Sequence, residues 1–230
     1  ICQWTRPPKG GLEAGPKLTL ELFRQLLGEE LTKVKAELSD GRYDEAAALL
    51  RATRLSRPPV IDGILDDEAW TTATLPAGTW LSYNPLHGDR IPQQTTVWVA
   101  YDAGALYVAF KCDDPDPSQI KTSITRRDNI WNDDWVGLSL DALGTGQVAY
   151  HLMVNPSGIQ LDMINTIAGY EDTSPDWVWD SAGRVNDSGY AVEIRLPLQT
   201  IRFAGGAEVG MGILFWRRVS RIGVSVAWPA

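Results

Sequence analysis

The sequence predicts a mainly β fold: an antiparallel β-sandwich, jelly-roll-like, preceded by an N-terminal α-helical hairpin. Three observations predict it. Apolar residues at helical spacing are confined to the first part of the chain. From Pro58 onward, short segments of alternating apolar and polar residues are separated by Gly, Asn, Asp and Pro. Almost all of the ten tryptophans lie in this second part, where they can fill a core or form a flat surface for a ligand.

The helical hairpin is predicted within residues 1–52. Residues 18–38 carry an apolar stripe at helical spacing, formed by Leu20, Phe23, Leu27, Leu31, Val34 and Leu38. Ser39-Asp40-Gly41 ends this helix, and an Ala-rich second helix follows from Asp44 to about Leu55. The pattern changes near residues 51–57. We therefore expect a hairpin domain at 1–52 and a sandwich domain at 53–230.

The sandwich domain contains a series of short strand candidates. The first two, 96–101 and 106–112, flank Asp102-Ala103-Gly104, a short turn that suits a β-hairpin. Further candidates follow at 136–140, 148–154, 159–164, 182–185, 190–196, 210–216 and 224–228. Turn sequences such as Asn155-Pro156-Ser157-Gly158 separate them. This spacing is typical of an antiparallel sandwich.

Charge and composition exclude several classes of function. The net charge of −8 is carried by residues 53–230, which hold 13 basic and 21 acidic residues. An acidic body argues against nucleic acid, whose binding depends on cationic contacts with phosphate. The sequence contains no transmembrane segment, because no run approaches the ~18 apolar residues of a membrane span. Cys112 is predicted to be a reduced core thiol.

The N-terminal sequence Ile1-Cys2-Gln3-Trp4 has no initiator methionine and no signal peptide. We therefore expect the chain to be a fragment of a longer protein.

The sandwich domain resembles the family 9 carbohydrate-binding modules, and more closely the family-9-like domain at the N-terminus of certain bacterial outer-membrane proteins. The resemblance covers about residues 58–229. It depends on five stretches: 59–70 (PVIDGILDDEAW), 101–108 with its Tyr-Asp and Leu-Tyr-Val, 131–141 beginning Trp-Asn-Asp-Asp-Trp-Val, 154–158 (VNPSG) and 189–197 (GYAVEIRLP).

The resemblance implies a non-catalytic domain that binds a mono- or oligosaccharide by holding a sugar ring between Trp131 and Trp228. Gly137 and Met153 stand at or near the positions where the family has an acid and an arginine. The polar contacts are therefore expected from other residues: Asp133, Asp134, His151, Arg126 or Arg127. The implied role is carbohydrate catabolism at the cell envelope, in the periplasm, at the outer membrane or outside the cell. The alternative is a structural or interaction domain of an outer-membrane protein that has lost sugar binding.

A calcium site is a second candidate. Asp113, Asp114 and Asp116 cluster in one predicted loop, and calcium prefers carboxylate and carbonyl oxygens. Because their spacing matches no complete calcium loop, a solvated loop is the competing interpretation and no cofactor is required. Asp66, Asp67 and Glu68 are expected to cap a short helix that ends at Trp70. We find no catalytic motif, so an enzyme is not predicted.

Residues 1–49 resemble the C-terminal helical region of malate synthases. The likeness depends on Ile1-Cys2-Gln3-Trp4, Gly15-Pro16-Lys17-Leu18-Thr19, the stretch 22–27 and Glu29-Glu30-Leu31. The family's catalytic base would precede residue 1, and its barrel is absent. The resemblance therefore implies at most an inactive fragment or a fused reading frame.

Overall fold

The computed structural model describes residues 52–72, 80–85, 87–206 and 209–228. The chain divides into two units, Ile1–Arg51 and Ala52–Ala230, and all described residues belong to the second. The predicted helical hairpin and the malate synthase resemblance fall almost entirely on residues 1–51. The part on residues 1–51 lies outside the described residues. The second helix was expected to reach about Leu55, and this end of it is corrected, because Thr53–Arg54 form a β-strand.

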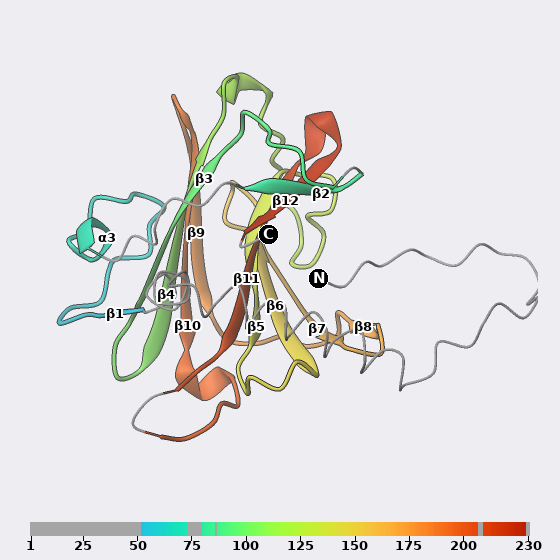
Figure 1. Ribbon diagram of the computed structural model, residues 1–230. Coiled ribbons are helices and arrows are strands. Elements are labelled where there is room, and N and C mark those ends of the chain that lie inside the picture. The colour runs from blue at the N-terminus through green and yellow to red at the C-terminus, as the bar shows by residue number, and fades with distance from the viewer. Residues whose placement is uncertain (1–51, 73–79, 86, 207–208, 229–230) are drawn as a thin grey trace, which may run out of the picture. The chain divides into compact units, whose positions relative to one another are not determined.

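The second unit consists of two β-sheets, as predicted for a sandwich (Figure 1). The five-stranded sheet has the order β1 (Thr53–Arg54), β3 (Thr95–Tyr101), β4 (Ala105–Asp113), β10 (Gly189–Pro197), β9 (Asp180–Asn186). The seven-stranded sheet has the order β2 (Leu81–Asn84), β12 (Val224–Trp228), β11 (Gly212–Val219), β5 (Trp135–Asp141), β6 (Val148–Val154), β7 (Gln160–Thr166), β8 (Glu171–Asp172). One detail of the prediction is wrong: β1 pairs with β3 in parallel, whereas the other described pairs are antiparallel.

Alternation along the strands builds the core between the two sheets. On β5, Val136, Leu138 and Leu140 point inward, where they meet inward side chains of β4 and β10 such as Phe110 and Ile194. Burial of such apolar surface is the main force that holds two sheets face to face. Cys112 belongs to this core as a free thiol, as predicted, and burial raises its pKa to about 11.

The segment before β2 covers the outer face of the five-stranded sheet. Its helix α3 (Ala69–Thr72) lies on the side of that sheet away from the other sheet (Figure 1). The expected helix ending at Trp70 is corrected: α3 begins at Ala69 and continues past Trp70. The fully buried carboxylate of Glu193 on β10 accepts hydrogen bonds from the backbone N–H groups of Asp62 and Gly63 and from the Trp70 indole, at 2.7–2.9 Å. These bonds attach the segment to the sheet.

The opposite, outer face of the seven-stranded sheet carries the remaining apolar cluster. We call this the outer cluster; its members are Ile130, Trp135, Met153, Leu161 and Met163, with Ile159 and Trp216 packed against it. The members that lie on β5, β6, β7 and β11 occupy the positions that alternate with the inward residues of those strands. A second apolar surface on this sheet explains why the loop that carries Ile130 folds over it.

Candidate functional site

Trp131 is the exposed tryptophan of the described chain. Its residue is 49% exposed, and each of the other eight tryptophans in the described ranges is buried or intermediate. It directly follows Ile130, which is fully buried in the outer cluster. Leaving an indole in water is unfavourable, so an exposed tryptophan beside a packed apolar surface is typical of a ligand-binding or interaction surface.

Two aspartates predicted as sugar ligands instead hold the loop that carries Trp131. Asp133 is buried, and one of its carboxylate oxygens accepts bonds from Ser123 N, Ser123 Oγ and Asn155 Nδ2 at 2.7–3.1 Å. Asp134 is fully buried and accepts a 2.8 Å bond from Ser220 N; burial raises the pKa of its carboxyl. Both carboxylates face into the protein. Their effect is to fix the loop and so to orient Trp131.

The position of Trp228 corrects an expectation. Trp228 is 7% exposed and belongs to the core between the sheets, where its ring stacks on Phe215 at a centroid distance of 5.8 Å. One face of the Trp228 indole is therefore covered by another aromatic ring. Trp131 follows a residue of the outer cluster, whereas Trp228 points to the inner face of the same sheet.

Trp216 is the tryptophan that the structure adds to the outer face. It stands opposite Gly137 in the β11–β5 ladder and packs against the outer cluster. Tyr83 on β2 meets its ring edge-on, with centroids 4.7 Å apart. The outer face thus carries the partly exposed rings of Trp216 and Tyr83.

His151 lies on the same face, as a histidine kept neutral by its surroundings. It is 8% exposed, and burial lowers its pKa to about 4. Its Nδ1 is 3.0 Å from Ser139 Oγ, and its ring stacks on Trp216 at 6.5 Å. Of the predicted polar ligands, His151 is the one that the fold brings beside an outer-face tryptophan. Arg126 is exposed in the loop before Ile130, and Arg127 instead contacts Asp162 and the Trp177 carbonyl.

Gly137 and Met153 lie directly opposite each other on β5 and β6. A Cβ atom at Gly137 would lie 2.3 Å from the Leu152 carbonyl oxygen and 2.8 Å from Met153 Cγ. The backbone and the methionine side chain therefore fill the space that an acidic side chain would need. At this point of the outer face the surface is apolar.

The aspartates predicted to bind calcium have other partners. Both oxygens of Asp114 pair with the Arg221 guanidinium at 2.6–2.7 Å, which holds the pKa of that carboxyl below its usual value despite burial. Asp113 pairs with Lys111, and Asp116 accepts a bond from Ser118. The structure does not bring Asp113, Asp114 and Asp116 together as a ligand group within the described ranges.

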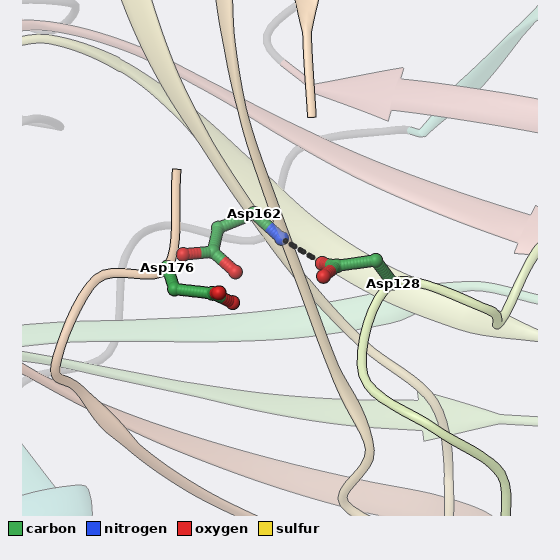
Figure 2. A group of neighbouring side chains, drawn as sticks. All are labelled: Asp128, Asp162 and Asp176. Atoms are coloured by element: carbon green, nitrogen blue, oxygen red, sulfur yellow. Dashed lines mark hydrogen bonds between the residues drawn. The ribbon is translucent and has the colours of Figure 1, made fainter. Parts of the chain in front are cut away.

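A different carboxylate group is formed by Asp128, Asp162 and Asp176, whose oxygens lie within 4.8 Å of one another (Figure 2). Arg127 supplies positive charge to it: its guanidinium is 2.7 Å from Asp162 and 3.3 Å from Asp176. Asp128 Oδ1 also accepts the backbone N–H of Asp162 at 3.1 Å. The group can be understood as an ion-pair network that connects the loop before Ile130 to β7, and it does not require a cation.

A two-sheet sandwich with an exposed tryptophan on a loop held by buried hydrogen bonds is typical of β-sandwich ligand-binding modules. The chain belongs to the carbohydrate family 9 binding domain-like family, whose model matches residues 61–218. Modules of this family bind carbohydrates and are not enzymes. The described residues contain no helix that is long and apolar enough to cross a membrane.

Three solved structures are similar to this chain. A putatively carbohydrate-binding protein from Bacteroides uniformis has a TM-score of 0.52 at 14% identity, over 77% of this chain and 87% of that one. A family 9 carbohydrate-binding module from Caldicellulosiruptor kristjanssonii matches in its complexes with glucose and with cellotriose. Each match has 18% identity and a TM-score of 0.45, over 77% of this chain and 85% or 83% of that one. No curated protein matches the chain.

Proposed function

We propose that this domain binds a mono- or oligosaccharide by stacking a sugar ring on Trp131, as part of polysaccharide use at the cell envelope. The observation that carries the proposal is the exposure of Trp131, which is 49%, on a loop held by Asp133 and Asp134. A sugar presents C–H groups that an indole face can cover. A fixed indole loses little freedom on binding, which favours affinity.

The second aromatic surface is proposed at Trp216. Trp228 would have to leave its stack on Phe215 and its place in the core before a sugar could contact it. Trp216 faces outward beside Tyr83 and needs no such rearrangement. Pairing of Trp131 with Trp228 stays a prediction, and exchanging each tryptophan separately distinguishes the two arrangements.

The test is calorimetric titration with glucose, cellotriose and xylan fragments. Trp131→Ala should weaken binding by about five- to thirtyfold, because it removes about 1–2 kcal/mol of stacking and apolar contact. Trp216→Phe should also weaken binding. Tyr101→Ala is the matched control, since Tyr101 is 38% exposed at the end of β3 in the other sheet. Trp131→Ala binding as tightly as the parent chain would overturn the proposal.

A second candidate is a structural or interaction domain that keeps the fold without sugar binding. The close contact between Gly137 and Met153 favours it, because hydroxyl groups need polar partners and these two residues offer none. Absence of heat in every titration of the parent chain, with its thermal unfolding intact, would favour this second function.

A further inference from the structure

We infer that Trp216, Ser139 and His151 form a hydrogen-bonded chain that presents the Nε2–H group of His151 as a donor for a hydroxyl of a saccharide bound at the outer face. The inference rests on the proposed function and deepens it by assigning the polar contact. The three residues come from neighbouring strands, β11, β5 and β6, and all point to the outer face.

The direction of the chain follows from what each group can donate. The Trp216 indole Nε1–H is hydrogen-bonded to Ser139 Oγ, and an indole nitrogen can only donate. Ser139 Oγ is therefore an acceptor in that bond, and its own hydrogen is available for His151 Nδ1, 3.0 Å away. Nδ1 is the acceptor within reach of that hydroxyl hydrogen among the described residues, so we assign Nδ1 as the unprotonated nitrogen, the arrangement that leaves the hydroxyl hydrogen paired.

A neutral imidazole carries one proton, so the proton of His151 is on Nε2. Burial keeps the ring neutral, since its pKa is lowered to about 4. Trp216 restricts the ring further by stacking on it. The tautomer and the orientation of the donor are thus both set by side chains of the outer face.

Nε2–H has no hydrogen-bond partner among the described residues. The residue retains 8% exposure, and this nitrogen is not among the fully buried unpaired atoms of the described chain. A poorly hydrated donor without a protein partner gains most from an acceptor supplied by a ligand. A sugar hydroxyl or ring oxygen is such an acceptor, and the adjacent Trp216 and Tyr83 rings can contact its C–H surface.

A Ser–His pair also occurs in hydrolases, but this one does not fit that role. Ser139 is 8% exposed, and its hydroxyl oxygen accepts the Trp216 N–H, which makes that oxygen a poor nucleophile. The histidine contacts serine through Nδ1, and no carboxylate bonds to Nε2 among the residues described. Ser139 is therefore a positioning residue for a binding contact.

The experiment compares two exchanges at His151 by calorimetric titration with the sugar that the parent chain binds most tightly. His151→Gln keeps an N–H donor near the Nε2 position, whereas His151→Met keeps a similar volume beside Met153 and Met163 and removes the donor. His151→Met should bind about three- to tenfold more weakly, as for loss of one neutral hydrogen bond. His151→Gln should retain most of the affinity. Both variants must show the near-UV circular dichroism of the parent chain.

Nitrogen-15 NMR of the histidine ring tests the positioning by Ser139 independently of any sugar. The parent chain should show a protonated Nε2 and an unprotonated Nδ1, and Ser139→Ala should give a mixture of tautomers. Equal binding by the parent chain and His151→Met, or a protonated Nδ1 in the parent chain, would overturn the inference while sugar binding stands. No binding by the parent chain would remove the proposed function and this inference together.

Discussion

At the scale of single residues, His151 connects the site to the stability of the fold. A histidine that is charged in the unfolded chain and neutral in the folded one makes stability depend on pH. Ser139, Met163 and Trp216 surround it, and none of these titrates in the acid range. The ionisable side chains on the same face of these strands are Tyr83, Arg218 and Asp141.

The folded chain should lose stability as the pH falls from about 6.5, the ordinary histidine pKa, towards the value of about 4 that His151 has when folded. Above about pH 6.5, His151 is neutral in both the folded and the unfolded chain, so its titration costs no stability. Below that pH the unfolded chain binds the proton before the folded chain does, and the free energy of unfolding falls. At pH 5 the loss amounts to about 2 kcal/mol. Urea unfolding at pH 7 and pH 5 measures it. His151→Gln should lack this part of the pH dependence, and the exposed His87→Gln serves as control.

The choice between Trp216 and Trp228 shows why a site is harder to predict than a fold. Strand alternation places Phe215 inward and Trp216 outward, and the sequence alone does not decide between the two faces, because either choice turns Arg217 or Arg218 inward where an arginine is expected to face water. Instead Arg217 is fully buried between the sheets. A shift of one residue in such an assignment moves every side chain of a strand to the other face. Trp131 is an easier case, because its sequence neighbours Asn129, Asn132 and Asp133 are polar and favour the exposed loop position that the structure shows.

At the scale of elements, the segment from Asp62 to Trp70 depends on one carboxylate. Glu193 is buried beneath it and accepts all three bonds described above, so its charge is compensated by donors from the backbone and the indole. Burial nevertheless raises the pKa of Glu193, while these donors oppose the rise. The segment is thus attached to β10 by polar contacts as well as by the apolar cluster around Trp70.

Glu193→Gln should destabilise the fold by about 1–3 kcal/mol, because an amide offers one oxygen where the carboxylate offers two, and its NH₂ group would face a donor. Denaturant midpoints measure the difference. Glu171→Gln on the exposed strand β8 is the matched control and should leave the midpoint unchanged. An unaltered midpoint for Glu193→Gln would show that the apolar contacts alone hold the segment.

The long strands could be predicted and the short edge strands could not. Residues 148–154 and 224–228 were predicted with the observed bounds, and the others differ by one to three residues at their ends. β1, β2 and β8 contain two to four residues, which is too short for alternation to be recognised. Their pairing depends on neighbouring strands, and so on contacts distant in sequence.

At the scale of the whole sandwich, Arg217 joins the two sheets. It belongs to β11 of the seven-stranded sheet, and its guanidinium donates to the Gln94 and Asp113 carbonyls and to Thr95 Oγ1 near one end of the five-stranded sheet. It also lies 5.4 Å from the Tyr190 ring centroid. A buried charge is stable only when its hydrogen-bond acceptors are in place. Arg217 therefore fixes the position of one sheet relative to the other.

Arg217→Met should therefore lower the free energy of unfolding by about 3–5 kcal/mol, because buried carbonyl groups lose their donor. Thermal and urea unfolding at pH 7 give the measurement. Arg195→Met is the control, since Arg195 pairs with Asp180 on the surface, where such pairs contribute about 0–1 kcal/mol. Similar losses for the two variants would contradict a linking role for Arg217.

The apolar contact between Gly137 and Met153 has a consequence for which sugars can be told apart. Stereoisomers differ in the direction of single hydroxyl groups. A surface formed by a thioether side chain and backbone makes no contact that favours one of these directions over another. Discrimination between stereoisomers would therefore depend on polar contacts at the edge of the bound sugar ring, such as the one proposed for His151. Under the proposed function, we expect such a domain to bind several epimers with similar, modest affinity, which would suit capture of mixed glycans better than selection of one.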